Sequence, residues 1–432
     1  MRKHFSLLLI VALVCMSAQA QTRYVGGDIS MLPKYEKYNS PYKDANSKNI
    51  QNLLTWFIYE CGWNTFRVRL FVNPDGSDPS VCQDLAYVTS LGKRIKEQGA
   101  YFMLDFHYSD TWVDASHIQA PTAWKNASSA AKADSIGAYT RRVLTALNEA
   151  GATPDLIQVG NEIMYGLCGI KVSPYDNSAT DANWPAYINL LKAGCSAVRE
   201  ICPNAQIIIH TDRPNEVKNT KYYYTKLINN EVDFDVIGLS YYPFWHGYLT
   251  SAQSTTNLVS SIQSYSEAFP NKRIQIVEFA YNFQWWPSSG VKYDTQNIWP
   301  CSKKGQYAFV KDIVDNLKPL NHLDGISYWF PEEAGNGDNG SVIPSWLNRG
   351  FWAEEQSNTG HAINRTGQIS NGQTAADVCA PYYMRQFYNS TEAIETIPVP
   401  ARTQTRKMLQ EGRLVLIHPD GFLFAPDGSR LR

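Results

Sequence analysis

The sequence has no excess of either charge, and this absence excludes one class of partner. Lys and Arg number 39 against 40 Asp and Glu, for a formal net charge of −1. Without the first 20 residues, which carry Arg2 and Lys3, the count is 37 against 40 and the net charge is −3. Proteins that bind nucleic acid carry a basic surface. We therefore expect no nucleic-acid partner.

The sequence also lacks a hydrophobic run that could cross a membrane, since a span takes roughly 20 apolar residues. The chain opens with two cations, a shorter apolar run and the small-x-small sequence Ala18-Gln19-Ala20. This pattern predicts a signal peptide over residues 1–20, cleaved near Ala20, and an exported protein that is periplasmic, cell-surface or extracellular. The alternative is a lipid anchor at Cys15, but bulky Val14 stands where a small residue is wanted.

Cysteine is scarce, with eight residues, of which one lies in the predicted signal peptide. The seven that remain leave at least one thiol unpaired, while an oxidising compartment allows one to three disulfides. Cys195 and Cys202 lie about 10.5 Å apart along a predicted helix, beyond disulfide reach unless the helix ends before Cys202. No pair has zinc-ligand spacing, so we expect no structural zinc.

Eight short apolar or β-branched runs alternate with segments of helical periodicity. The runs are 24–31, 64–72, 101–108, 156–162, 206–212, 234–243, 274–283 and 325–332, and clear helical segments are 81–100, 133–152 and 187–203. This alternation predicts an α/β fold, a (β/α)₈ TIM barrel over residues 21–393. A doubly wound open sheet is the alternative, but "YVGGD" lacks the G-x-G-x-x-G spacing of its phosphate loop.

The segments that follow four of the predicted strands are long. They are residues 109–130, 163–183, 284–304 and 333–375, and active sites of barrels are built from such βα loops. Residues 394–432 differ in composition and predict a linker and a small hairpin-like tail with Pro-Asp-Gly at its turn.

Polar residues gather at the C-terminal ends of the predicted strands, where a buried parallel strand should be apolar. Glu162 and Glu278 end two of these strands, and two carboxylates across one barrel mouth suit cleavage of a glycosidic bond. One would donate a proton and the other would act as nucleophile or base. The structural alternatives are a helix-initiating acid for Glu162 and a salt-bridged carboxylate for Glu278.

Two arginines support this interpretation of Glu278. Arg67 and Arg69 alternate with Val68 on one strand and so point the same way. A guanidinium beside Glu278 would keep that carboxylate ionised, and Tyr242 could hydrogen-bond it. The alternatives are a structural ion pair for the arginines and core packing for Tyr242.

The segment "DFHYSDTW" concentrates hydrogen-bonding groups in eight residues. Asp105, His107 and Asp110 suit sugar hydroxyls, as does Asp212 at the end of another strand, and Trp112 offers a flat apolar face. A metal site from Asp105, His107 and Asp110 is the alternative, but it lacks a metalloenzyme spacing such as H-E-x-x-H. Other tryptophans expected in the same loops, some of them only for packing, are Trp124, Trp245, Trp285, Trp286, Trp299, Trp329, Trp346 and Trp352.

Five motifs occur in order along the chain, and together they carry a family resemblance. They are "FRVRLFVNP", "LDFHYSDTW", "VGNEI", "GLSYYPF" and "IVEFAY". The chain resembles glycoside hydrolase family 53, the arabinogalactan endo-β-1,4-galactanases, over about residues 24 to 390. The resemblance implies a barrel of glycosidase clan A that cleaves β-1,4-galactan internally with retention of configuration.

The resemblance also implies roles for single residues. Glu162 matches the general acid/base and Glu278 the nucleophile. Asn161 would hold the 2-hydroxyl of the reacting sugar, Arg67 and Tyr242 would position the nucleophile, and Trp329 would form the floor of the subsite before the scissile bond. We expect a monomer that acts on galactan and galactooligosaccharides. The alternatives are another clan A β-glycanase, for mannan or glucan, and a non-catalytic galactan-binding protein.

The chain departs from the family at three places. "DTWVDASHIQ" leaves the substrate contacts of Asp114 and His117 open, and "YWFPEE" leaves the roles of Glu332 and Glu333 open. Some members bind calcium in an Asp-rich loop after the seventh strand. Here that loop has one acid, Asp294, whereas Ca²⁺ takes about six to eight oxygen ligands. We therefore expect no calcium, no other cofactor and no metal site.

Overall fold

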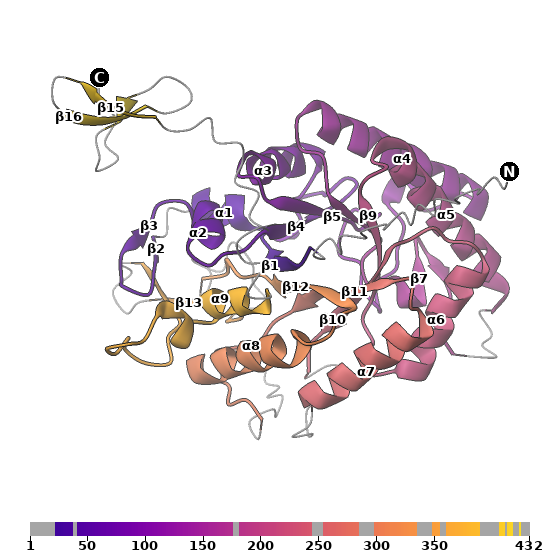
Figure 1. The fold of residues 1–432 in the computed structure, drawn as a ribbon. Helices are drawn as coiled ribbons and strands as arrows, with labels where there is room; N and C mark the ends of the chain where they lie inside the picture. Colours follow the sequence, from indigo (N-terminus) through magenta and orange to yellow (C-terminus); the bar gives the residue numbers. More distant parts are fainter. Residues whose placement is uncertain are drawn as a thin grey trace, which may run out of the picture.

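Eight parallel strands close into a barrel at the centre of the molecule (Figure 1). They are β1 (Tyr24–Asp28), β4 (Thr65–Leu70), β5 (Tyr101–Phe106), β6 (Leu156–Val159), β9 (Gln206–Thr211), β10 (Val236–Tyr241), β11 (Arg273–Phe279) and β12 (Leu323–Trp329). Each strand pairs with the next barrel strand along the chain, and β1 closes the barrel against β12. The predicted (β/α)₈ fold is confirmed. The computed structural model describes residues 22–37, 41–175, 181–243, 254–284, 298–334, 348–354, 360–388, 406–410, 413–417 and 423–424.

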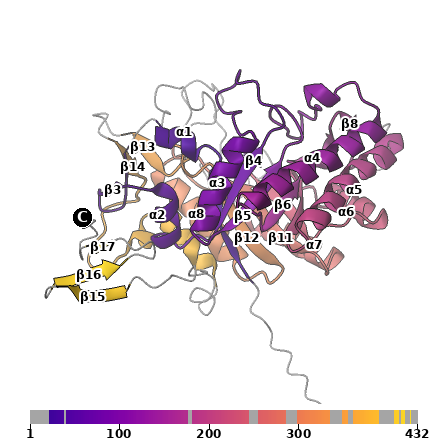
Figure 2. The same ribbon diagram turned by 90° about the horizontal axis from the view of Figure 1, so that it is seen from above.

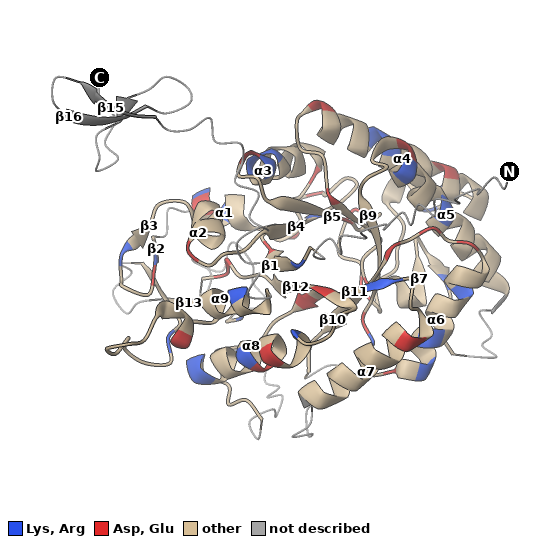
Figure 3. Ribbon diagram, viewed as in Figure 1, with Lys and Arg blue, Asp and Glu red and all other residues tan. Residues whose placement is uncertain are grey.

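Helices surround the barrel and connect its strands (Figures 1 and 2). The α-helices are α1 (Leu32–Lys37), α2 (Leu53–Tyr59), α3 (Leu85–Glu97), α4 (Ser129–Glu149), α5 (Trp184–Ile201), α6 (Val217–Asn229), α7 (Ser254–Ala268), α8 (Lys303–Leu317) and α9 (Ala380–Tyr383). Short 3₁₀ turns are η1 (Thr122–Trp124), η2 (Ile163–Tyr165), η3 (Asp181–Asn183), η5 (Ala375–Asp377) and η6 (Met384–Phe387). Lys and Arg share helices such as α4 and α8 with Asp and Glu (Figure 3), consistent with the balanced charge.

Helix caps account for the differences from the predicted helix boundaries. The predicted segment 81–100 is α3, which begins after Asp84 because that side chain accepts a hydrogen bond from the Tyr87 amide. The segment 133–152 is α4, which begins earlier because Ser128 caps it. The segment 187–203 is α5, which has Pro185 in its first turn, and Cys202 lies just past its end.

The interior of the barrel changes from apolar to polar along the strands. One buried layer consists of apolar side chains from six strands: Tyr24, Met103, Leu156, Ile208, Val236 and Val277. Two residues further along three neighbouring strands, inward positions carry polar groups that bond from one strand to the next: Asp105, Gln158 and His210. The apolar layer therefore closes one end of the barrel, and the C-terminal ends hold the chemistry.

Smaller sheets lie outside the barrel. One joins segments distant in sequence in the order β13 (Trp352–Glu354), β14 (His361–Ile363), β2 (Tyr42–Lys43) and β3 (Asn49–Ile50), and another pairs β7 (Gly166–Leu167) with β8 (Ile170–Lys171). In the tail, β16 (Arg413–Ile417) and β17 (Leu423–Phe424) pair antiparallel, and β15 (Arg406–Gln410) adds a third strand; the predicted Pro-Asp-Gly turn lies outside the described residues. The domain boundary at residue 393 stays a prediction.

Three further expectations concern single features. The seven cysteines of residues 61–379 are all free, although α5 does end before Cys202. No helix within the described ranges is long and apolar enough to span a membrane. Trp299 and Trp352, expected in the active-site loops, are buried packing residues. Asp294 and four of the tryptophans expected in these loops lie outside the described residues: Trp245, Trp285, Trp286 and Trp346.

Candidate active site

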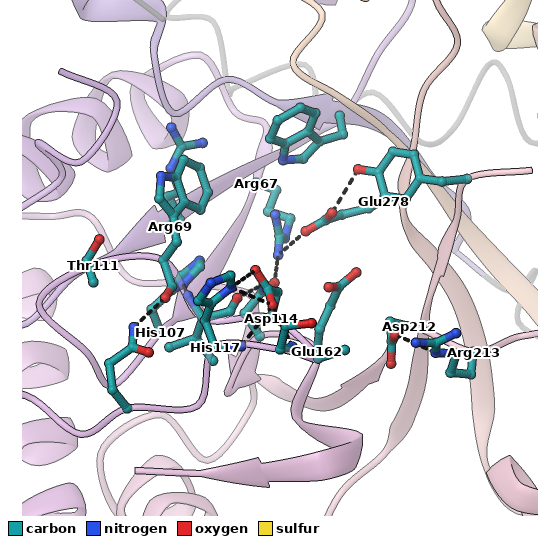
Figure 4. Close-up of a pocket in the computed structure, with 18 of the residues that line it drawn as sticks. Arg67, Arg69, His107, Thr111, Asp114, His117, Glu162, Asp212, Arg213 and Glu278 are labelled. Carbon is teal, nitrogen blue, oxygen red and sulfur yellow. Dashed lines mark hydrogen bonds and ion pairs between the residues drawn. The ribbon is translucent and has the colours of Figure 1, made fainter. Parts of the chain in front are cut away.

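A cleft of about 650 Å³ opens at the C-terminal ends of the barrel strands (Figure 4). Nine of the predicted site residues line it: Arg67, His107, Trp112, Asn161, Glu162, Asp212, Tyr242, Glu278 and Trp329. The remaining residues of its wall are Arg69, Thr111, Val113, Asp114, Ala115, Ser116, His117, Gln119, Arg213 and Arg349. Strands far apart in the sequence therefore supply one common site.

Arg67 is the centre of the polar network beneath the cleft, and its side chain is only 1% exposed. Its guanidinium lies 2.7 Å from Asp28 Oδ2, 2.8 Å from Asp105 Oδ2 and 2.8 Å from Glu278 Oε1. It also donates to Asn161 Oδ1 at 2.8 Å. Burial lowers the pKa of Arg67, but the three carboxylates raise it by more, so the guanidinium stays charged.

Glu278 is held at both oxygens. Oε1 pairs with Arg67, and Oε2 accepts a hydrogen bond of 2.9 Å from the Tyr242 hydroxyl. A register shift in the pairing of β10 with β11 comes just before Glu278, and such bulges redirect side chains. Burial raises its pKa to about 7, while Arg67 opposes this rise. The salt-bridged carboxylate considered from the sequence is present, and it lies in the cleft.

Glu162 stands on a strained turn directly after β6. Its backbone is left-handed (φ 47°, ψ 47°), and Gly160 two residues earlier has φ 95°. A non-glycine residue in this conformation costs roughly 1–3 kcal/mol, and such strain gathers at functional sites. Glu162 precedes the 3₁₀ turn η2, but its side chain makes no capping hydrogen bond. The Glu162 carboxylate therefore does not cap a helix, and the helix-initiating role considered from the sequence is wrong.

The carboxyl group of Glu162 is half-buried and lies between two other acids, Glu278 and Asp212 (Figure 4). Burial, followed by the charges of Asp212 and Glu278, raises its pKa well above the usual range. Among its contacts with the described residues, Glu162 has no ion pair like that of Glu278 with Arg67, and the two pKa values are therefore pushed apart. Such a separation assigns an acid and a nucleophile to two residues of the same type.

Three residues that the sequence interpretation left without a role connect to Glu162. Ser240 Oγ donates to Glu162 Oε1 at 2.6 Å, and His210 Nε2 lies 2.8 Å from Ser240 Oγ. Gln158 Nε2 lies 2.9 Å from His210 Nδ1. His210 is a polar residue near the end of the predicted strand 206–212. Gln158 alternates with the buried Leu156 on β6, and Ser240 lies on the same face of β10 as the buried Val236; a polar residue on such an apolar face is the signal that could have identified them.

Asp105 and His107 form a buried pair at one side of the cleft. Asp105 does not line the cleft but lies beneath Arg67, with His107 Nε2 at 3.2 Å from its Oδ2. Burial raises the pKa of Asp105, but Arg67 and His107 lower it by more, so the net shift is downward. His107 Nδ1 accepts a hydrogen bond from the Val113 amide, so Nε2 carries the proton that faces Asp105.

Asp110 and Trp112 differ in where they lie. Asp110 is not in the wall of the cleft, and its Oδ2 accepts a hydrogen bond of 2.8 Å from the Thr122 amide. Trp112 lines the cleft with the Arg69 guanidinium 4.5 Å from its ring centroid. No cluster of three or more His, Cys, Asp or Glu side chains within the described ranges is arranged to hold a metal ion.

Glu332 and Glu333 are fully buried and bind backbone amides. Glu332 Oε1 accepts from the Met31 amide at 2.9 Å. Glu333 Oε2 accepts from the amides of Arg349 and Gly350 at 3.0 and 2.9 Å. Neither lines the cleft, but Glu333 anchors the segment that brings Arg349 into it. Arg349, which the sequence interpretation missed, lies with its guanidinium 5.8 Å from the centroid of the Tyr242 ring.

Asp114 and His117 both line the cleft at its more exposed side. His117 Nδ1 lies 2.8 Å from Asp114 Oδ2, and their side chains are 65% and 39% exposed. Asp212, on the side of Glu162, pairs with Arg213 at 3.0 Å. Burial raises the pKa of Asp212 to about 6, while Arg213 opposes this rise. These residues give both ends of the cleft polar groups.

The closed barrel and its paired carboxylic acids define a class of protein, the glycoside hydrolases. The model of glycosyl hydrolase family 53 matches residues 24–376 of the chain. The chain therefore belongs to glycosyl hydrolase family 53.

Relatives and solved structures agree with this assignment. The chain is 30% identical to the "probable arabinogalactan endo-beta-1,4-galactanase A" of Aspergillus fumigatus, over 83% of this chain and 98% of the relative. It is 28% identical to the endo-beta-1,4-galactanase of Bacillus subtilis, over 71% and 69%. A GH53 catalytic domain of Ignisphaera aggregans superposes with a TM-score of 0.68 at 27% identity, covering 84% of this chain and 96% of that one. A fungal beta-1,4-galactanase gives 0.65 at 25% identity, over 79% and 97%.

Proposed function

We propose that the protein is a retaining endo-β-1,4-galactanase that cleaves β-1,4-D-galactosidic linkages in galactan and in arabinogalactan side chains. The observation that carries the mechanism is the different treatment of the two acids. Glu278 is clamped by Arg67 and Tyr242, whereas Glu162 has no cationic clamp of this kind among its described contacts and has a strongly raised pKa. The galactanase names of the relatives support the choice of substrate.

The reaction follows from these positions in two steps. Glu278 attacks the anomeric carbon while Glu162 gives its proton to the departing glycosidic oxygen, which leaves a covalent galactosyl ester on Glu278. A water molecule then attacks the same carbon, Glu162 takes its proton, and the ester bond to Glu278 breaks. Asn161, fixed by Arg67 and by its own bond to the Val113 carbonyl at 2.7 Å, is placed for the sugar 2-hydroxyl.

Digestion of linear β-1,4-galactan tests the proposal. A ladder of intermediate oligomers, with products first released as the β-anomer in proton NMR, is the expected result. Galactose or one fixed short oligomer from the outset would mean attack from a chain end. Activity on mannan or glucan but not on galactan would mean that the protein is another β-glycanase. Tight binding of galactan without products would favour a non-catalytic binding protein.

The cellular context completes the proposal. The opening residues support export after cleavage near Ala20. N-terminal sequencing of the secreted protein should therefore begin at or near Gln21. A single species of one chain in light scattering would support the monomer.

A further inference from the structure

The two oxygens of the Glu162 carboxyl group have different surroundings. Oε1 accepts the hydrogen bond of Ser240 at 2.6 Å, on the wall formed by β10. Ser240 is fully buried, whereas Glu162 is half-buried and lines the cleft. A protonated carboxylic acid has one O–H donor, and either oxygen can carry it. The direction of the Ser240 hydrogen bond therefore decides which oxygen is the acid.

Gln158 fixes the protonation of His210, because its own amide has only one orientation that suits its neighbours. Its Oε1 accepts from Arg67 Nε at 3.3 Å, so its Nε2 is the group that donates to Asp105 Oδ1 at 2.8 Å. That same Nε2 lies 2.9 Å from His210 Nδ1. A donor therefore faces Nδ1 from the side of Gln158.

A second donor faces the same ring nitrogen. The Glu162 amide donates to His210 Nδ1 at 3.3 Å, so Nδ1 is an acceptor and the imidazole proton is on Nε2. Nδ1 also lies 3.2 Å from Asn161 Oδ1, but an acceptor facing an acceptor makes no hydrogen bond. The Nε2 proton then points to Ser240 Oγ at 2.8 Å.

The Ser240 hydroxyl has one proton, and His210 leaves it one direction. Because Oγ accepts from His210 Nε2, its own proton is directed to Glu162 Oε1. We propose that Ser240, oriented by His210, is a positioning residue that reserves the acidic proton of Glu162 for Oε2. This inference rests on the proposed function, in which Glu162 is the general acid/base.

The arrangement has a consequence in each step of the reaction. In the first step Oε2 gives its proton to the glycosidic oxygen, and Ser240 stabilises the negative charge that develops on the carboxylate. In the second step the free Oε2 takes a proton from the attacking water. The same oxygen therefore serves as acid and then as base, and the carboxyl group does not have to rotate between the two steps.

Ser240→Ala tests the proposal with two substrates that differ in their need for an acid. We expect kcat/KM on galactooligosaccharides to fall about tenfold, since a hydrogen bond to a charged group is lost. From a 2,4-dinitrophenyl β-galactobioside the leaving group departs as 2,4-dinitrophenolate, which needs no proton. General acid catalysis therefore contributes little, and kcat/KM on this substrate should change by less than about threefold.

The pH profile gives a second reading. The groups that face Glu162 are Ser240, His210, Asp212 with Arg213, Glu278 and Asp114. The hydrogen bond from Ser240 favours the ionised form of Glu162, and Ser240→Ala removes it. The alkaline limb of kcat/KM should therefore move up by about one pH unit in Ser240→Ala. Ser240→Thr keeps the hydroxyl and should restore the limb, and His210→Leu should behave as Ser240→Ala does.

Thr211→Ala is the matched control, because it deletes a buried hydroxyl next to His210 that bonds instead to Tyr224 at 3.3 Å. It should leave both substrates and the pH profile unchanged. An equal loss on both substrates in Ser240→Ala, with no movement of the alkaline limb, would overturn the proposal and leave Ser240 a packing role. Failure of the proposed function is distinct, since the unaltered enzyme would then not cleave galactan.

Discussion

Replacing Arg67 with Met removes the cation that three buried carboxylates share. The methionine side chain occupies similar space without charge, so the change acts on electrostatics more than on packing. Asp28, Asp105 and Glu278 would lose contacts of 2.7, 2.8 and 2.8 Å. Asp28 would keep the Arg69 guanidinium at 3.5 Å and a hydrogen bond from the Ser30 amide at 3.0 Å.

The size of the effect follows from the burial. Removing one partner of a buried ion pair costs about 3–5 kcal/mol, because the remaining charge is left without compensation. Arg67 and both aspartates are at most 1% exposed, so solvent does not screen the loss. Unfolding entropy is about 2.1 cal/mol/K per residue, and for a barrel of this size the cost lowers Tm by about 4–6 °C.

The loss of stability in Arg67→Met should become smaller as the pH falls. In the unaltered protein Arg67 and His107 lower the pKa of Asp105, so its contribution to stability is complete above the unfolded value near 4 and is lost only at lower pH. In Arg67→Met the buried carboxyl groups of Asp105 and Glu278, whose pKa values Arg67 lowers, take up protons that the unfolded chain does not hold at pH 7. The free energy of unfolding that is lost by burying these carboxyl groups without a counter-ion therefore becomes smaller as the pH falls, by about 1.4 kcal/mol per pH unit for each proton. The difference in Tm should therefore be smaller at pH 5 than at pH 7.

Thermal unfolding followed by tryptophan fluorescence at pH 5 and pH 7 measures the difference in Tm between the unaltered protein and Arg67→Met. Arg94→Met is the matched control, because Arg94 makes a bidentate pair with Glu36 at 2.7 and 2.8 Å, with both side chains about one-third exposed. Such a surface pair contributes about 0–1 kcal/mol. Equal Tm values for Arg67→Met and Arg94→Met, or a difference that does not narrow at pH 5, would refute the account of Arg67 as the shared counter-ion.

Four further outcomes concern the reaction. Glu278→Gln should abolish turnover, while Glu162→Ala with azide should release β-galactosyl azide from an activated substrate; an α-azide product would contradict retention. In the unaltered enzyme, kcat/KM should fall as the pH drops through about 7, where Glu278 takes up a proton; a profile that stays flat down to pH 5 would contradict this. Prolonged dialysis against EDTA should leave kcat on galactan unchanged, and a loss restored by a divalent cation would support the metal site considered at Asp105, His107 and Asp110.

The sequence predicts all eight barrel strands, since each is an apolar run between helical segments. The strands are shorter than predicted at their C-terminal ends: β6 ends at Val159 and not at Glu162. Asn161, Glu162 and Asp212 belong to the turns that follow their strands, where backbone geometry such as that of Glu162 is irregular. The four-stranded sheet that joins Trp352–Glu354 to Tyr42–Lys43 could not be predicted, because its strands are very short and its partners lie about three hundred residues apart.

The sequence predicts only part of the site, because some of its residues are brought there by contacts between distant segments. Glu162, Glu278, Arg67 and Tyr242 are identifiable because each ends or lies on a strand with a motif around it. Arg349 lies in a loop with no pattern of its own, and backbone hydrogen bonds to Glu333, Gln306 and Tyr328 hold it at the cleft. Long-range contacts of this kind leave no periodic trace in a sequence.

Buried glutamates show why a perturbed pKa alone does not locate an active site. Burial raises the pKa of Glu333 to about 8, against about 7 for Glu278, yet Glu333 lies outside the wall of the cleft. Desolvation is the largest cause in both, so the shift measures depth and not function. What separates them is the chemistry of their partners: backbone amides hold Glu333 as part of the scaffold, while Arg67 and Tyr242 hold Glu278 with its carboxylate facing the cleft. The partners therefore identify which buried glutamates are catalytic. The relative pKa values of Glu162 and Glu278 then indicate which of the two is the proton donor.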